Sequence, residues 1–210
     1  MKDIKLIHGD SLQALRGYGD NYFDVAIVDP PYGLGDRLVK GGAKGGMGTM
    51  RNLADDKVTT WDDKIPPPEY FTELQRVSKN QIIWGGNYFV EHLQNFRCFI
   101  FWDKTIHGNS YADGEMAWTS FKTSAKKFDK SPNQLNRIHP TQKPTDLYKW
   151  LLSRYGKEGD RILDTHLGSG SIAIACHDLK FDLVGLELDE KYFNKATKRL
   201  KEHQSQLSLF

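Results

Sequence analysis

A glycine-rich turn, residues 164–171, places the tightest limit on how this chain can fold. The turn follows a short apolar run at residues 161–163, typical of a buried strand, and leads into residues 172–179, whose apolar pattern predicts a helix. A strand, a tight glycine turn and a helix N-terminus together form the nucleoside or phosphate cradle of Rossmann-like folds. The next predicted strand ends at Glu187, about twenty residues beyond the glycines, where an acid accepts hydrogen bonds from ribose hydroxyls. The sequence therefore predicts an α/β fold with a nucleoside site at the carboxyl edge of its sheet.

A second predicted strand ends in an acid and an aromatic residue. Residues 24–28 form a run rich in Val and Ile, and Asp29-Pro30-Pro31-Tyr32 follows at once. Two prolines in series fix φ and remove backbone donors, so the chain presents carbonyl acceptors in a rigid geometry. With the Asp29 carboxylate, these acceptors suit a substrate that offers hydrogens, such as the exocyclic amine of a planar base, and Tyr32 offers that base a face for stacking. The alternative is a plain turn after a strand.

Length and composition indicate one intracellular domain. The chain has 210 residues and a net charge of only +2, so any attraction to nucleic acid depends on local patches. Cys98 and Cys176 stand far apart without metal-ligand spacing, which favours reduced core thiols in a cytosolic protein and no structural metal. No apolar run approaches the roughly eighteen residues of a membrane span. We therefore expect a soluble protein of the cytoplasm.

The coarse secondary structure alternates strands with helices. Helical spacing of apolar residues predicts helices at residues 69–78, 145–155, 172–179 and 189–204, with shorter ones after Ser11 and at residues 88–93. Seven segments have the composition of strands, and they begin near residues 4, 24, 81, 98, 115, 161 and 182.

Two regions lack such periodicity. Residues 33–60 are glycine-rich and leave directly from the Asp29 motif, so we interpret them as a lid that orders on substrate, with a disordered loop as the alternative. The end of the second region, 103–137, is basic, which suits a nucleic-acid backbone, with a solvated loop as the alternative. We expect a single domain, residues 1–210, with 33–60 and 103–137 as nucleic-acid-contacting or target-recognition insertions. The residues that carry the second interpretation are Lys122, Lys126, Lys127, Lys130, Arg137 and the interleaved Phe128.

Dinucleotide binding is an alternative for the glycine turn. After Gly168-Ser169-Gly170 the third position of the dinucleotide pattern holds Ala173, a substitution that the pattern tolerates. Acids at several strand ends, Asp164 and Asp10 among them, instead suit a positively charged sulfonium that carries an adenosine and needs no pyrophosphate pocket. Lys143 could pair with the carboxylate of its amino-acid tail.

The order of these motifs resembles the circularly permuted β-class of DNA amino-methyltransferases, from residue 5 to about residue 200. In that class the catalytic motif precedes the S-adenosylmethionine motif, and residues 139–144, His-Pro-Thr-Gln-Lys-Pro, match the segment between them. The resemblance implies a Rossmann-like methyltransferase fold with a seven-strand, mainly parallel sheet, helices on both faces, and one antiparallel strand at residues 115–121. The usual family pattern has Phe where this chain has His166, so the cofactor contact of that position is open. The resemblance implies a catalytic set and a cofactor-binding set. The catalytic residues are Asp29, Pro30, Pro31 and Tyr32. The cofactor-binding residues are Asp10, Asp29, His139, Thr141, Lys143, Asp164, Gly168, Ser169, Gly170 and Glu187.

The activity that the resemblance implies is methyl transfer from S-adenosylmethionine to the N6 amino group of adenine in DNA, by base flipping and direct in-line transfer. An Asp rather than a Ser at the first motif position favours adenine over the N4 of cytosine. An N4-cytosine enzyme, an RNA or protein amino-methyltransferase, and a DNA-binding protein without turnover are the alternatives. The implied partner is DNA, with a homodimer as an option, no membrane and no metal, in a bacterial cell or phage-infected host. Four histidines are interpreted as structural or surface residues: His92, His107, His177 and His203.

Overall fold

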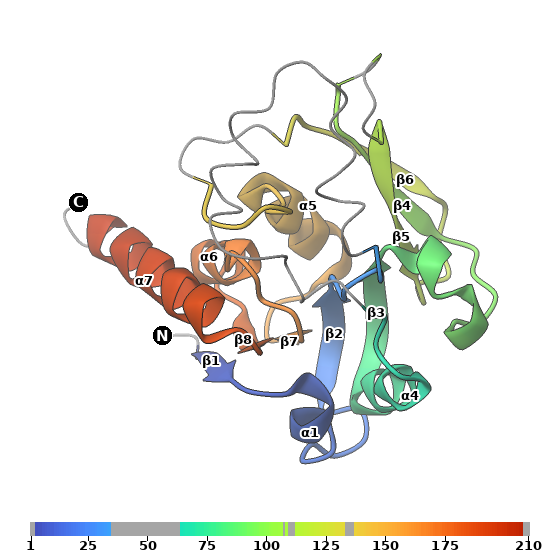
Figure 1. Cartoon of the computed structure of the whole chain (residues 1–210), viewed down its shortest axis with the longest axis horizontal. Coiled ribbons are helices and arrows are strands. Elements are labelled where there is room, and N and C mark those ends of the chain that lie inside the picture. Colours follow the sequence, from blue (N-terminus) through green and yellow to red (C-terminus); the bar gives the residue numbers. More distant parts are fainter. Residues whose placement is uncertain (1–2, 35–63, 107, 109–111, 133–136, 208–210) are drawn as a thin grey trace.

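In the described part of the chain, eight strands form one sheet in the order β1-β8-β7-β2-β3-β5-β4-β6 (Figure 1). The computed structural model describes residues 3–34, 64–106, 108, 112–132 and 137–207. The strands are β1 (Ile4–His8), β2 (Phe23–Val28), β3 (Ser78–Trp84), β4 (Phe99–Asp103), β5 (Gly114–Thr119), β6 (Lys126–Asp129), β7 (Arg161–Asp164) and β8 (Asp182–Glu187).

The sheet is mainly parallel, as predicted. Strands β1, β8, β7, β2 and β3 pair in parallel, whereas β5 runs antiparallel to both of its neighbours, β3 and β4. The single antiparallel strand that was expected at residues 115–121 is therefore confirmed at Gly114–Thr119. The expected strand number, seven, is wrong by one, because β6 adds a parallel strand at the edge beside β4. The strand has four residues, three of them charged, so its sequence shows no alternation of apolar and polar residues from which it could be predicted. Such short charged strands are typical of sheet edges.

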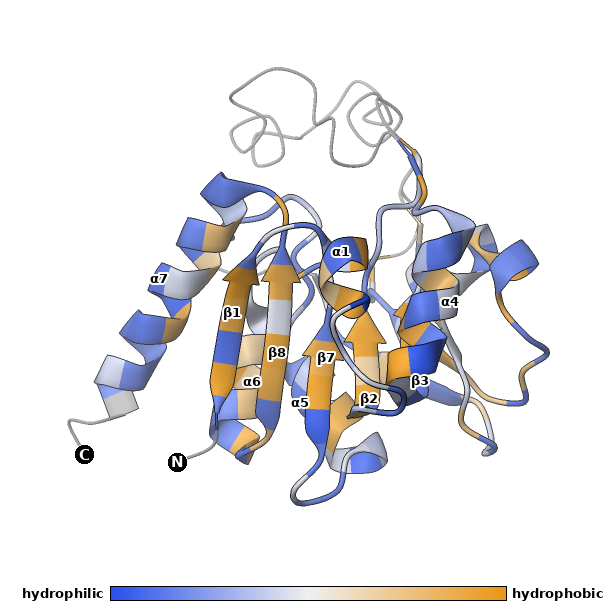
Figure 2. Cartoon of the chain, turned by 90° about the horizontal axis from the view of Figure 1, so that it is seen from below, coloured by the Kyte–Doolittle hydropathy of each residue, from blue (hydrophilic) through white to orange (hydrophobic). Residues whose placement is uncertain are grey.

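Helices cover both faces of the sheet (Figures 1 and 2). Of the helices in the described residues, two lie on one face and three on the other. Alternate side chains of β2 contribute to the core on each face. Val25 and Ile27 belong to the core beneath the three-helix layer, whereas Ala26 and Val28 belong to the core beneath the two-helix layer. The helices are α1 (Ser11–Leu15) and α4 (Pro68–Val77) on one face, and α5 (Thr145–Tyr155), α6 (Ser171–Leu179) and α7 (Glu190–Leu207) on the other.

Element boundaries differ from the sequence prediction at a few places. Helix α4 starts at Pro68, a residue suited to the first helical turn, and ends at Val77, because Ser78 is already extended and begins β3. The helix expected at residues 88–93 is two 3₁₀ turns, Gly86–Tyr88 and Val90–His92. Both cysteines are buried and free, as expected. Among the residues that the structure describes, no helix is both long enough and apolar enough to span a membrane.

Candidate active site

A cavity of about 1160 Å³ opens over the carboxyl ends of the parallel strands. Residues that directly follow three of these strands line it, Gly9 after β1, Asp29 after β2 and Thr165 after β7, and Glu187 closes β8. The cavity then extends across to β4 and β5, where Glu115 forms part of its wall. The topology thus brings the glycine turn and the Asp29 motif, 135 positions apart at residues 29 and 164, to one edge of the sheet.

Most of the residues assigned from the sequence line this cavity. Asp164 and Gly170 do not. Asp164 is buried, and its Oδ1 accepts a hydrogen bond from the His166 backbone N–H at 3.0 Å. Burial raises the pKa of this carboxyl to about 8. Gly170 has φ +71° and packs so closely on α7 that a Cβ there would lie 3.1 Å from Ala196 Cβ. Asp164 and Gly170 therefore support the glycine turn without lining the cavity. The assigned residues that line the cavity are Asp10, Asp29, Pro30, Pro31, Tyr32, His139, Thr141, Lys143, Gly168, Ser169 and Glu187.

Carboxylates gather at the end of the cavity beside the glycine turn. Glu187 accepts hydrogen bonds from the backbone N–H groups of Gly168 (2.7 Å) and Asp189 (3.0 Å). Burial raises the pKa of Glu187, and these two donors lower it in part. Asp10 caps α1 by accepting from the Gln13 N–H at 2.7 Å. A carboxylate offers about four lone-pair sites, so each acid keeps acceptor capacity for a ligand. This end of the cavity suits hydroxyl groups rather than an anionic pyrophosphate.

Neutral imidazoles form part of the wall nearby. His139 is buried against Tyr192, with ring centroids 4.3 Å apart, and a Cβ on Gly168 would lie 3.8 Å from the His139 ring. Burial lowers the pKa of His139 to about 3. Its Nδ1 accepts from the Thr141 N–H at 3.3 Å. The structure places His166 edge-on to a buried tyrosine, and burial lowers its pKa to about 4, so a planar, uncharged ring lies at this position too.

The Asp29 carboxylate is the centre of a charge network whose members are buried or partly buried. The Tyr32 hydroxyl donates to Asp29 Oδ1 at 2.7 Å, and Lys143 Nζ donates to Oδ2 at 2.5 Å. Lys143, with a side chain only 2% exposed, also lies 2.9 Å from Glu115 Oε2. Lys104 holds the other oxygen of Glu115 at 2.7 Å. The sequence did not single out Glu115. The one available signal was an acid at the start of an otherwise apolar strand.

Tyr32 is held by aromatic and backbone contacts. Its ring stacks on Tyr88, with centroids 5.0 Å apart and planes 15° from parallel, and Phe89 meets it edge-on. Gly85 lies against the ring: it has φ +68°, and a Cβ there would come within 2.2 Å of Tyr32 Cε1. Burial, together with the charges of Asp29 and Glu115, raises the pKa of the phenol, so it stays a hydrogen-bond donor.

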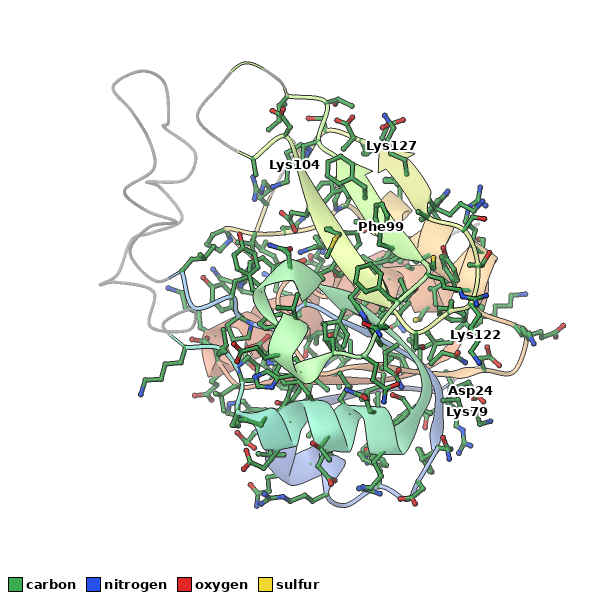
Figure 3. All side chains as sticks on the ribbon, turned by 90° about the vertical axis from the view of Figure 1, so that its right-hand side faces the viewer. Asp24, Lys79, Phe99, Lys104, Lys122 and Lys127 are labelled. Carbon is green, nitrogen blue, oxygen red and sulfur yellow. The ribbon has the colours of Figure 1, made fainter. Side chains whose placement is uncertain are left out.

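The basic region after residue 122 is less open than its sequence indicates. Part of it is β6, which carries Lys127 (Figure 3). Lys127 pairs with Asp129 at 2.8 Å and with Asp103 at 3.3 Å. Lys130 pairs with Asp146 at 2.5 Å. These two lysines are therefore already ion-paired with carboxylates of the domain. The predicted lid, residues 33–60, lies outside the described residues from 35 onward.

Two of the histidines interpreted as structural share one carboxylate. Asp178 Oδ1 lies 2.6 Å from His203 Nε2 and 3.2 Å from His177 Nδ1. Lys149 holds the other oxygen at 2.6 Å, and these contacts lower the pKa of Asp178 to about 2 although burial opposes the shift. The sequence showed no pairing for these histidines, because the contact joins α6 to α7. None of these four residues lines the cavity over the strand ends.

Known proteins share this chain's sequence pattern. The type II methyltransferase M.HpaI of Haemophilus parainfluenzae is 24% identical over 94% of this chain and 74% of its own length. The type II methyltransferase M2.DpnII of Streptococcus pneumoniae is 30% identical over 68% of this chain and 49% of its own length.

Solved structures share the fold. M1.HpyAVI in complex with SAM superposes with a TM-score of 0.61 at 20% identity, over 94% of this chain and 98% of that one. The cytosine-N4-specific PvuII DNA methyltransferase superposes with a TM-score of 0.63 at 11% identity, over 98% and 93%. The family model described as DNA methylase, N6_N4_Mtase, matches residues 83–198, which is more than half of the chain. This chain therefore belongs to that DNA methylase family.

Proposed function

We propose that this protein transfers a methyl group from S-adenosylmethionine to the N6 amino group of adenine in DNA, within the cytoplasm of its cell. The observation that carries the proposal is the Asp29 carboxylate at the end of β2. It lies in one cavity with the acid-lined end beside the glycine turn. An acceptor for an amine and a site for an adenosine thus share one cavity.

The residues present fit the cofactor. Glu187, held by two backbone N–H groups, keeps lone pairs for ribose hydroxyls, and Asp10 is anchored on the neighbouring strand end. Asp189 also lines this end, and three carboxylates there disfavour the pyrophosphate of a nicotinamide dinucleotide while they suit a cationic sulfonium. When bound, S-adenosylmethionine supplies an electrophilic methyl group.

The chain's part in the reaction is to prepare the amine. The nitrogen of an aromatic amine is a poor nucleophile because its lone pair is delocalised into the ring. Hydrogen bonds from that amine to the Asp29 carboxylate and to the Pro30 carbonyl return the lone pair to nitrogen and aim it. Tyr32 donates to one Asp29 oxygen and Lys143 to the other, and each oxygen has a further lone pair with which to accept from the amine.

The base has to leave the duplex to reach this cavity. Tyr32 stacks on Tyr88 with ring centroids 5.0 Å apart, and Tyr88 is exposed, so the pair offers an aromatic surface at the cavity on which an extruded base can be held. Asp at position 29 favours adenine, by resemblance to the β-class enzymes. Cytosine N4 is the second candidate, since the family model spans both groups of enzymes and the PvuII structure shares the fold.

The test is the chemical identity of the product. Purified protein is incubated with duplex DNA and methyl-labelled S-adenosylmethionine, and the digested nucleosides are separated and identified by mass. We expect labelled N6-methyladenine. Labelled N4-methylcytosine would overturn the choice of base, and no labelled nucleoside would overturn the proposed function.

A further inference from the structure

Lys143 creates an electrostatic conflict at the proposed catalytic carboxylate. Its ammonium donates to Asp29 Oδ2 at 2.5 Å, and the side chain is almost fully buried. A cation in direct contact withdraws electron density from Asp29, yet the proposed chemistry needs that carboxylate as a strong acceptor for the amine. In a buried site such a contact is strong, because little solvent screens it.

Glu115 offsets this cation. Its Oε2 lies 2.9 Å from Lys143 Nζ, so the ammonium is shared between two carboxylates. Its Oε1 is held by Lys104 at 2.7 Å, which fixes the side chain on β5. The four groups Asp29, Glu115, Lys143 and Lys104 sum to zero charge. Although burial raises the pKa of Glu115, Lys143 and Lys104 outweigh it and hold the pKa well below its usual range, so Glu115 is ionised at neutral pH.

We infer that Glu115 is a positioning residue that acts through Lys143 to keep Asp29 a competent acceptor for the target amine. This inference rests on the proposed function. Without Glu115, the whole charge of Lys143 falls on Asp29, which then accepts a weaker hydrogen bond from the amine. The cofactor end of the cavity, lined by Glu187 and Asp10, has no part in this role.

The experiment compares Glu115→Gln with the parent in single-turnover methylation of a defined duplex, at saturating cofactor and DNA. Glutamine keeps the size of the side chain and removes its charge. We expect the rate to fall about tenfold or more, while the dissociation constants of S-adenosylmethionine and DNA change less than about threefold. Glu115→Asp, which keeps the charge, is expected to recover part of the rate. An unchanged rate in Glu115→Gln would overturn the inference. A parent without any methyl transfer would instead overturn the proposed function.

A double-mutant cycle with Lys143→Met separates this role from direct substrate contact. If Glu115 acts through Lys143, Glu115→Gln slows methylation much less in the Lys143→Met background than in the parent. Equal slowing in both backgrounds would overturn the inference. Where a variant is too slow to assay, the same cycle is measured by urea unfolding. Glu115→Gln should lower the free energy of unfolding more in the parent than in the Lys143→Met background, because only in the parent does it remove a carboxylate partner from a buried ammonium. Additive effects on unfolding would contradict the coupling.

Asp178→Asn is the matched control. Asp178 is an acid with a lysine partner, Lys149, at 2.6 Å, and its side chain is 16% exposed, compared with 22% for Glu115. It lies outside the cavity. We expect Asp178→Asn to lower the free energy of unfolding and to leave the single-turnover rate within about twofold of the parent. A rate loss as large as that of Glu115→Gln would mean that any loss of an ion pair slows the enzyme, and the inference would fail.

Discussion

At the scale of single residues, the site depends on how Asp29 and Tyr32 are held. The carboxylate lies between a phenol donor and a buried ammonium, at 2.7 Å and 2.5 Å. The phenol ring in turn lies against Gly85 and Tyr88. Each contact fixes a group whose orientation decides whether an amine can be bound and polarised.

Replacing Asp29 with alanine removes the proposed acceptor for the amine. We expect single-turnover methylation to fall about a hundredfold or more, the scale of removing one preorganised electrostatic interaction. Binding of DNA should hold, and cofactor binding should weaken at most modestly. Asp24→Ala is the control, because Asp24 lies near the start of the same strand but contacts Lys79 and the Arg161 N–H at the opposite edge. It should reduce stability without reducing the rate. Parental activity in Asp29→Ala would show that the motif is only a turn.

Gly85→Ala tests the placement of Tyr32. Alanine is strained at φ +68°, and its Cβ would overlap the Tyr32 ring at 2.2 Å, so the ring has to move away from Tyr88 and Asp29. We expect a loss of about 1 to 3 kcal/mol of stability by urea unfolding and a clear loss of methylation rate. Gly19→Ala is the control, since a Cβ there meets nothing within 4 Å. Equal behaviour of the two variants would contradict the proposed role of the ring contact.

At the scale of elements, β6 changes the interpretation of the basic region. Its pairing with β4 aligns Lys127 with Phe101 and Asp129 with Asp103. Lys127 forms ion pairs with both of these aspartates, at 3.3 Å to Asp103 and 2.8 Å to Asp129. Phe128 packs on Trp150 of α5 instead of facing solvent, with ring centroids 5.4 Å apart. The segment is part of the folded sheet. Its lysines therefore differ in what they offer to DNA.

Two pairs of lysine variants distinguish these contributions. Lys127 and Lys130 each have carboxylate partners within the domain, so Lys127→Ala with Lys130→Ala should change the salt dependence of DNA binding little. Lys122 and Lys126 carry the proposed phosphate contacts. Replacing both with alanine should lower the slope of log K against log salt by about one unit for each phosphate that the protein no longer neutralises. Cofactor affinity should stay unchanged in both. The proposal for this region fails if the second pair leaves the slope as it is.

At the scale of the whole molecule, buried titratable groups make stability depend on pH in two opposite ways. Burial lowers the pKa values of His139 and His166 to about 3 and 4, from 6.5. The unfolded chain then binds more protons than the folded one between those values and 6.5, so the free energy of unfolding rises with pH across this window and falls on acidification. Asp164 acts in the other direction. Burial raises its pKa from 3.8 to about 8, so the folded state binds the extra proton and stability falls as pH rises across that range.

His166→Phe tests the first effect. The variant removes one group that must bind a proton on unfolding, so the slope of the free energy of unfolding against pH should decrease between about pH 4 and 6.5. The decrease should approach about 1.4 kcal/mol per pH unit at most, the value for one proton. Urea unfolding at several pH values across this window measures the slope. A slope equal to that of the parent would show that His166 titrates normally in the folded protein.

Local sequence patterns determined much of this protein. The Val- and Ile-rich run before Pro30 and Pro31, and the glycines after residue 164, were readable because alternation and turn chemistry depend on residues close in the chain. These patterns predicted the α/β class. Together with the family resemblance, they also predicted the antiparallel strand and the edge of the sheet where the assigned residues lie. The family match supports that interpretation.

The tertiary structure alone decided the rest. Lys143 pairs with both Asp29 and Glu115 because the strand order β2-β3-β5 brings Glu115 of β5 near the end of β2. No local sequence pattern encodes the order of strands in a sheet. The same holds for β6, which pairs with β4, a strand about 26 residues earlier in the chain; Lys126 of β6 lies opposite Ile100 of β4. Asp164 was expected to face the ligand; in the folded chain its carboxyl is buried and accepts a hydrogen bond from the His166 backbone N–H. Long-range pairing and burial arise from contacts between distant segments, and these form only when the whole sheet is assembled.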